Sequence, residues 1–206
     1  MFHLKRQDFD DLDHLYKINL VNSCSGFKSA NLIGTKSNDG IPNVAVFSSV
    51  THFGSNPPLL GIIFRPVSDV PRNTYENIKE TGQFTINHIH WDIIEQAHHT
   101  SAKYNKRISE FEVTELEEEY KNNWHAPFVK GVPIQIALTY CEEYKIKANN
   151  TIQIIAEIKD LYVKDELVEK DGFINLSKGN VMTINGLDGY ALPSLKQRID
   201  YQRPIK

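Results

Sequence analysis

The chain lacks the long apolar run that a membrane-spanning helix needs. No stretch of its 206 residues approaches the roughly 20 consecutive apolar positions required to cross a bilayer. The N-terminus also has no apolar core followed by small residues, so it does not resemble a secretory signal. Only two cysteines occur, Cys24 and Cys141, and they form no CxxC pair. We expect reduced thiols, a cytoplasmic location and no membrane partner.

Several signatures of cofactor and metal sites are missing as well. No GxGxxG or GxxxxGK segment occurs, which argues against a dinucleotide-binding fold and a P-loop. HExxH and GxSxG are also absent. His88 and His90 would share one face of a strand, but no cysteine or acidic cluster accompanies them, so we expect no metal site. The net charge of −3 offers no electrostatic footprint for nucleic acid.

What the chain does contain is a series of extended segments. Asn38-Asp39-Gly40 and Ala148-Asn149-Asn150 each join two strand-like runs as hairpins. Helical signals are fewer, and we predict helices over residues 8–19, from Asn73 to just before Gly82, from Asp92 onward and over 115–120. Such irregular strand spacing favours an antiparallel barrel over a doubly wound sheet. We therefore predict one mainly β (α+β) domain over residues 1–206.

The segment VPRNTYENI, residues 70–78, is unusually rich in hydrogen-bond donors for a connection between strands. The Arg72 guanidinium, the amides of Thr74 to Glu76 and the Thr74 hydroxyl would converge at the positive end of the helix that begins at Asn73. Fixed donors, a bidentate cation and a favourable dipole are what a phosphate monoester requires. The alternative is a capped helix with an incidental surface arginine.

A second polar cluster ends an otherwise apolar strand. Ser48, Ser49 and Thr51 follow the run NVAVF, and Pro57-Pro58 then turns the chain back into LLGIIF. Hydroxyls and free amides above an apolar barrel suit a flat heteroaromatic ring with polar edges. An edge strand with solvated serines would give the same pattern.

Residues 43–87 carry four motifs in one order: N-x-A-x-F-S, S-x-P-P-L, R-N-T-x-x-N-I and G-x-F-x-x-N. In this combination they resemble the signature of the flavin reductase-like, FMN-binding split-barrel family. The later runs AHHTSAKYNKRISEF and GLDGYALPSLKQRIDYQRP are similar to the family as well. One departure is Asn73, where many relatives carry aspartate; its amide would make the phosphate corner less negative.

The resemblance implies a six-stranded antiparallel Greek-key split barrel with peripheral helices. It also implies a homodimer with one FMN per subunit near the interface. Residues 1–26 would be an N-terminal helical extension, and residues 177–206 a tail that packs on the barrel or on the partner. The cofactor-binding residues that it places in this sequence are Asn43, Phe47, Ser48, Ser49, Val50, Ser55, Arg65, Arg72, Asn73, Thr74, Asn77, His98, Thr100 and Ser101.

Several of these positions leave alternatives open. Asn77 could serve helix packing, the stem of Arg65 could lie along the barrel rim, and His98 could be a core histidine with a backbone partner. Farther along the chain, Tyr190, Arg198 and Tyr201 could reach the partner's cofactor or simply pack the tail.

The resemblance implies an FMN-dependent oxidoreductase, above all an NAD(P)H-dependent flavin reductase that passes electrons to free flavin or another small acceptor. No side chain need act as an acid or base, since the flavin carries the chemistry. A flavoprotein carrier without NAD(P)H turnover is the alternative, and a barrel that has lost its cofactor is a third hypothesis.

Overall fold

The computed structural model describes residues 1–67 and 72–204. Val70 and Pro71 of the predicted segment 70–78, and residues 205–206 of the predicted tail, lie outside the described residues. The strands are β1 (Lys28–Ser29), β2 (Asn31–Lys36), β3 (Pro42–Phe47), β4 (Thr51–Ser55), β5 (Pro58–Phe64), β6 (Gln83–His88), β7 (Glu118–Glu119), β8 (Phe128–Val129), β9 (Ile134–Ile146), β10 (Thr151–Val163), β11 (Thr183–Asn185) and β12 (Gly189–Ala191). The helices are α1 (His14–Cys24), α2 (Asn73–Thr81), α3 (Ile94–His99) and α4 (Glu110–Thr114), with 3-10 turns at Arg6–Phe9, Trp91–Ile93 and Asp165–Leu167.

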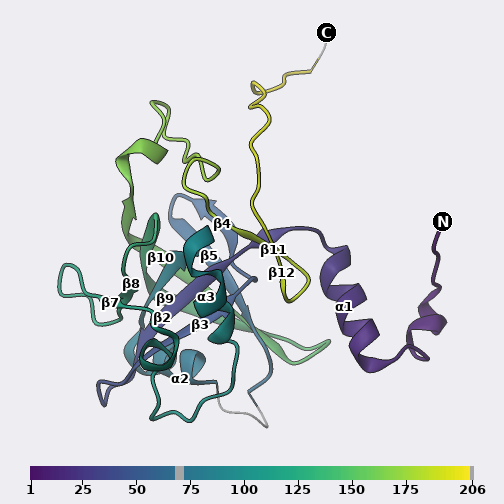
Figure 1. Ribbon diagram of the computed structural model, residues 1–206, viewed down its shortest axis with the longest axis horizontal. Helices are drawn as coiled ribbons and strands as arrows, with labels where there is room; N and C mark the ends of the chain where they lie inside the picture. Colours follow the sequence, from purple (N-terminus) through teal and green to yellow (C-terminus); the bar gives the residue numbers. More distant parts are fainter. Residues whose placement is uncertain (68–71, 205–206) are drawn as a thin grey trace.

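One antiparallel sheet dominates the molecule, in the order β3-β2-β6-β9-β10-β5-β4 (Figure 1). A three-stranded sheet, β1-β11-β12, and a two-stranded one, β7-β8, accompany it. The predicted mainly β class with peripheral helices is confirmed. The main sheet has seven strands rather than six, because Thr51, which we expected at the end of the preceding strand, begins a strand of its own that pairs with β5.

One face of this sheet carries the larger hydrophobic core. Successive side chains of a strand point to opposite faces, so every second residue points the same way. In β9 the inward residues are Ile134, Ile136 and Leu138, and β10 adds Ile154. Ile78 of α2 packs into the same cluster. This contact fixes the helix against the sheet.

A second core lies on the other side of β2 and β3. Ile33 faces the larger core, whereas its neighbour Leu32 packs with Val44, so β2 is buried on both faces. Ala97 of α3 and Phe111 of α4 belong to the second cluster. Both helices are therefore held beside β3, near the start of α2.

The helices follow the sequence predictions less closely than the strands do. α2 begins at Asn73 and ends before Gly82, as predicted, but Arg72 is the residue that caps it and no side chain makes the cap bond. Glu115 adopts a left-handed φ of 61° and ends α4. The prediction of a helix over 115–120 is therefore wrong, and Glu118 and Glu119 form a strand instead.

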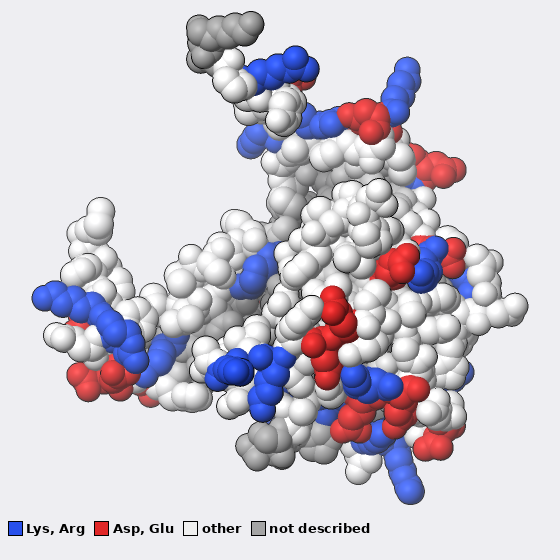
Figure 2. Space-filling model, turned by 180° about the vertical axis from the view of Figure 1, so that it is seen from behind, with Lys and Arg blue, Asp and Glu red and all other residues white. Residues whose placement is uncertain are grey.

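Both ends of the chain stand away from the body (Figures 1 and 2). α1 begins at His14, later than the predicted 8–19, and buries none of its residues. Among the described residues, no helix is both long and apolar enough to span a membrane. The visible face in Figure 2 carries acidic and basic side chains interspersed.

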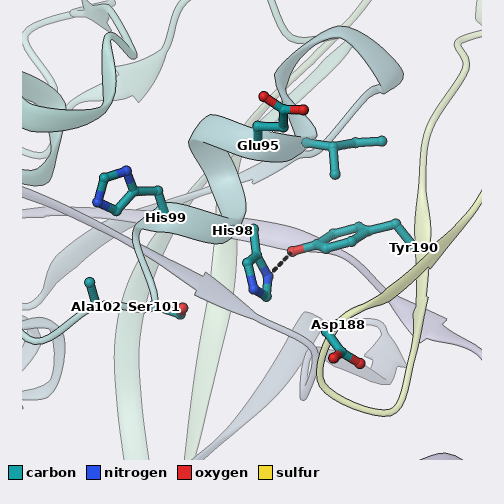
Figure 3. Close-up of a pocket in the computed structure, with 8 residues that line it drawn as sticks. Glu95, His98, His99, Ser101, Ala102, Asp188 and Tyr190 are labelled. Carbon is teal, nitrogen blue, oxygen red and sulfur yellow. Dashed lines mark hydrogen bonds between the residues drawn. The ribbon is translucent and has the colours of Figure 1, made fainter.

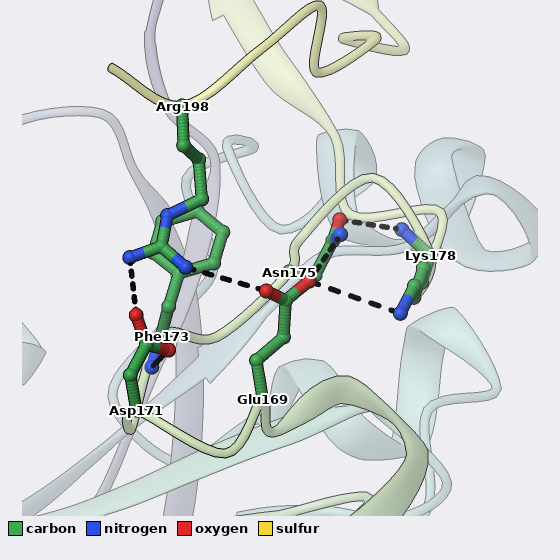
Figure 4. Close-up of polar contacts among 6 residues, drawn as sticks. All are labelled: Glu169, Asp171, Phe173, Asn175, Lys178 and Arg198. Atoms are coloured by element: carbon green, nitrogen blue, oxygen red, sulfur yellow. Dashed lines mark hydrogen bonds and ion pairs between the residues drawn. The ribbon is translucent and has the colours of Figure 1, made fainter. Parts of the chain in front are cut away.

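Arg198 fastens the C-terminal tail to the loop that follows β10 (Figure 4). Its guanidinium donates to Asp171 at 2.6 Å and to Glu169 at 3.3 Å, and it lies 4.2 Å from the ring centre of Phe173. Tyr201, farther along the tail, is 91% exposed. The tail thus packs against its own subunit at Arg198.

Candidate functional site

A cavity of about 820 Å³ lies where β3 and β5 end beside the start of α2. The loop between α3 and α4 closes its opposite side. Most of the predicted cofactor residues line it, although they come from distant parts of the chain: Asn43, Phe47, Ser48, Ser49, Arg65, Arg72, Asn73, Thr74, Thr100 and Ser101.

The start of α2 forms the most polar corner of the cavity. The first helical hydrogen bond among the described residues runs from the Glu76 amide to the Arg72 carbonyl, at 2.9 Å. The amides of Asn73, Thr74 and Tyr75 precede that bond, so they are the ones at the open end of the helix. The Glu76 amide, which we expected among the free donors, is engaged. The Nε of Arg72 is buried without a hydrogen-bond partner among the described residues.

A buried network supports this corner from below. The Asn43 side-chain amide lies 3.0 Å from the Thr74 hydroxyl and 3.2 Å from that of Thr35. Asn77 donates to the same Thr35 hydroxyl at 3.1 Å. Asn77 is buried and does not line the cavity, so its contacts hold α2 on β2.

Positive charge exceeds negative charge around the cavity. Its lining contains Arg65, Arg72, Lys103 and Lys106, against Glu76 and Glu110. Lys106 donates to Glu76 at 2.9 Å, which neutralises that carboxylate. Burial raises the pKa of Glu110, because the charged form loses its hydration. The cavity therefore favours an anionic group at the α2 end.

The other end of the cavity is more apolar. Phe47 packs edge-on against Phe64, with 5.0 Å between ring centres. Ser49 lies between strands: its hydroxyl donates to the Ile63 carbonyl at 2.9 Å and is 3.3 Å from the Ile63 amide. The Ser49 side chain thus ties the end of β3 to β5.

Three other predicted residues do not line this cavity. Val50 packs against the larger core. Ser55 is exposed in β4, where its hydroxyl lies 3.3 Å from Nε2 of His52. His98 lies instead in a neighbouring hollow.

That neighbouring hollow, of about 570 Å³, is bounded by α3 and the β11–β12 hairpin (Figure 3). Nδ1 of His98 lies 3.3 Å from the Tyr190 hydroxyl, and the two rings meet edge to face. Burial raises the pKa of Tyr190 to about 12. Ser101 and Ala102 line both the hollow and the cavity, so the two spaces adjoin.

Sequence reasoning missed other residues of the cavity. Glu110, Lys103 and Lys106 lie more than 20 positions beyond the end of α2, and no spacing pattern connects them with that helix. Asn22 of α1 and Leu187 of the β11–β12 turn also line it. The run AHHTSAKYNKRISEF was the one available signal for the first three residues.

The comparisons with known proteins agree with this architecture. The sequence matches the flavin reductase like domain family over residues 25–182. A crystal structure of a split-barrel protein from Shewanella frigidimarina NCIMB 400, classed with the flavin reductases, is 44% identical, has a TM-score of 0.94, and is matched over 98% of this chain and 100% of its own.

More distant structures share the fold. Nitrilotriacetate monooxygenase component B from Bacillus cereus is 17% identical with a TM-score of 0.84, over 97% of this chain and 98% of its own. An FMN-binding protein from Thermus thermophilus is 12% identical with a TM-score of 0.72, over 86% of this chain and 93% of its own. On the strength of the sequence match, which spans most of the chain, this protein belongs to the flavin reductase like family.

Proposed function

We propose that the protein is an FMN-binding oxidoreductase, specifically an NAD(P)H-dependent flavin reductase that delivers electrons to free flavin or another small acceptor. The observation that carries the proposal is the α2 corner of the cavity. There the Nε of Arg72 is buried without a hydrogen-bond partner among the described residues, and Arg72 is the N-cap residue of a helix whose first amides are open.

The residues present fit FMN in size and in charge. A cavity of about 820 Å³ is within the range of roughly 300–1,000 Å³ that small-molecule sites occupy. Arg72, the amides from Asn73 onward and the cationic lining would hold the phosphate. The backbone of Phe47 to Ser49 would border the ring edge, where its polar groups can pair.

FMN, when bound, supplies the two-electron chemistry, and the chain supplies orientation and electrostatics. Arg72 would hold one end of the ligand, and the segment that Ser49 ties to β5 would border the other. Donors held in advance at the ring edge would stabilise negative charge as it develops there. The adjoining hollow at His98 and Tyr190 would offer room for a second substrate beside the cavity.

Reconstitution followed by anaerobic reduction tests the proposal. The purified chain is mixed with FMN, freed of excess ligand, and monitored by its flavin absorbance while NADH or NADPH is added without oxygen. Rapid bleaching followed by reoxidation with added free flavin is the expected result. Flavin that stays bound but is not reduced by either nucleotide would identify an electron carrier instead. A chain that retains no flavin would contradict the proposal.

We also propose that the protein acts as a homodimer. α1 has 11 residues and none is buried, whereas isolated helices below about 12–15 residues are marginal in water. Leu15, Tyr16 and Val21 on this helix are exposed, and Asn22 at its end lines the cavity. A second copy of the chain covering α1 would bury these apolar side chains and stabilise the helix that carries Asn22.

A further inference from the structure

Glu110 is a buried carboxylic acid in the wall of the cavity. It is the first residue of α4 and is only 5% exposed. Its Oε2 accepts a hydrogen bond from the Val44 amide at 3.3 Å. Among the described residues it forms no ion pair, and burial raises its pKa. Because an unpaired buried carboxylate is costly, the neighbours of Glu110 decide which protonation state is favoured.

Asn43 connects Glu110 with the α2 corner. Its side-chain amide lies between Glu110 Oε2, at 3.3 Å, and the hydroxyls of Thr74 and Thr35. This amide can be placed in two orientations, which differ in the polar contacts that they satisfy. In one, Nδ2 donates to Thr74 and Oδ1 faces Glu110, but Nδ2 also lies 3.3 Å from the amide nitrogen of Val44, a second donor, so this orientation requires a donor from Glu110. In the other, Nδ2 donates to Glu110 and Oδ1 accepts from Thr74.

The protonation state of Glu110 selects between these orientations. An ionised carboxylate accepts only, so it requires the Asn43 nitrogen on its side. A protonated carboxyl can donate to Oδ1, which turns the nitrogen toward Thr74. The hydroxyl of Thr74 has a single hydrogen. When Glu110 is ionised, the Thr74 hydroxyl donates this hydrogen to Oδ1 of Asn43. When Glu110 is protonated, the Thr74 hydroxyl accepts from Asn43 and can donate its hydrogen into the cavity.

We propose that Glu110 is a positioning residue that, through Asn43, sets whether the Thr74 hydroxyl can donate to the phosphate of a bound ligand. Protonated Glu110 leaves that donor available, whereas ionised Glu110 withdraws it and adds a negative charge beside the phosphate. Phosphate binding is therefore coupled to proton uptake by Glu110. The inference rests on the proposed FMN site, which supplies the phosphate.

The effect of Glu110 on the pH dependence must be distinguished from the effects of the other charged groups on the elements around it. β3, which it contacts, has no titratable side chain. Lysine and arginine remain charged across the neutral range. The groups concerned are Glu112 on α4, Arg72 and Glu76 at α2, Lys103 and Lys106 on the preceding loop, and Glu95, His98 and His99 on α3.

The test compares FMN with riboflavin, which lacks the phosphate. Dissociation constants for both are measured by fluorescence quenching from about pH 4, near the ordinary carboxyl pKa, up to about pH 8.5. Relative to Glu110→Gln, whose side chain cannot ionise, the preference of the wild-type chain for FMN should fall about tenfold as pH rises, the order expected for one charge-assisted hydrogen bond. In Glu110→Gln only the ionisation of FMN itself should change the preference with pH.

Two further variants complete the test. Glu112→Gln, an exposed change on the same helix, should follow the wild type. Thr74→Val lacks the hydroxyl, so its pH dependence should shrink to the part that the charge of Glu110 causes directly. This gives a second readout if Glu110→Gln folds poorly. Ionisation of FMN itself acts equally on every variant. A Glu110→Gln chain with wild-type pH dependence, or one in which both ligands weaken equally, would overturn the inference while leaving FMN binding intact. Failure of every variant to bind either flavin would overturn the FMN site as well.

Discussion

At the scale of single residues, we expect the affinity of the cavity for an anionic ligand to depend most on Arg72. Its Nε is buried and unpartnered among the described residues. A buried donor on a charged group destabilises the folded chain until an acceptor reaches it. An anionic ligand that supplies this acceptor therefore regains free energy already lost on folding, which makes Arg72 the residue with the largest expected effect on affinity.

Replacing Arg72 by alanine should weaken FMN binding by about 1.5–3 kcal/mol, the contribution of a charge-assisted hydrogen bond. Riboflavin affinity should hardly change, since that molecule has no phosphate. Titration of both flavins by fluorescence quenching measures the two effects. Arg6→Ala serves as the control, because Arg6 pairs with Asp10 on the surface. Equal weakening of both flavins by Arg72→Ala would contradict the phosphate assignment.

His88 gives the structure a pH-sensitive position outside the cavity. It lies on β6 opposite Asn31, its Nδ1 is buried without a partner among the described residues, and burial lowers its pKa from 6.5 to about 4. In the unfolded chain His88 takes up a proton near pH 6.5, whereas in the folded chain it stays neutral down to about pH 4. Stability due to neutral His88 is thus complete above pH 6.5 and is lost as pH falls toward 4.

This position should contribute a loss of up to about 3 kcal/mol between these pH values, according to the linkage relation. Urea unfolding at several pH values should therefore show a shallower acid loss for His88→Gln than for the wild type. His14→Gln, an exposed change, should reproduce the wild-type curve. Parallel curves for all three chains would exclude His88 as the source.

Sequence reasoning located the residues that one short segment brings together. Arg72 and Thr74 lie at the start of one helix, and the residues next to them in the sequence are enough to predict where that helix begins. Glu110 instead meets Val44 across 66 positions. That contact exists only because β3 and α4 pack through the second core. No periodicity within α4 distinguishes a carboxylate facing a cavity from one facing water, so the prediction omitted it.

At the scale of elements, β2 shows how closely the second core and the sheet fit. A Cβ on Gly34 would lie 2.2 Å from the Pro127 carbonyl oxygen and 2.6 Å from the Thr85 hydroxyl. Thr85 donates to that same carbonyl at 2.6 Å. Both neighbours are buried and held, so neither can move aside cheaply.

Gly34→Ala should therefore destabilise the fold by about 1–3 kcal/mol, as overpacked cores do. The midpoint of urea unfolding measures the effect. Gly54→Ala provides a matched control in β4, where the nearest atom would be 3.4 Å away, at the Pro57 carbonyl oxygen. We expect only a small change there. A Gly34→Ala chain as stable as the wild type would mean that β2 and residue 127 can separate.

The elements also show which sequence patterns were sufficient. The long β9–β10 hairpin was predictable because alternation and the Asn149-Asn150 turn agree, and Asn150 indeed has a φ of 58°. The helix predicted over 115–120 failed because a charged run carries no information about packing. Its residues include Leu116, which is buried in the second core and holds the chain there in a non-helical path.

At the scale of the whole molecule, the two ends of the chain differ in how they are held. The tail is fixed at Arg198 by two carboxylates and an aromatic ring. Among the described residues α1 has no comparable ion-pair anchor to the barrel, and although Asp13 caps its start, it buries none of its own residues. Association with a second copy would bury its exposed apolar side chains and stabilise the helix.

Leu15→Lys combined with Val21→Lys should therefore convert a dimer into a monomer. Two charges placed in an apolar contact oppose its burial, while both side chains are already exposed in the single subunit, at 67% and 49%. Light scattering after gel filtration measures the mass. Val113→Lys, an exposed apolar position on α4, is the control and should remain dimeric. Because Asn22 of α1 lines the cavity, the monomer should also bind FMN less tightly. A wild-type chain that is already a flavin-loaded monomer would refute both the dimer and this role of α1.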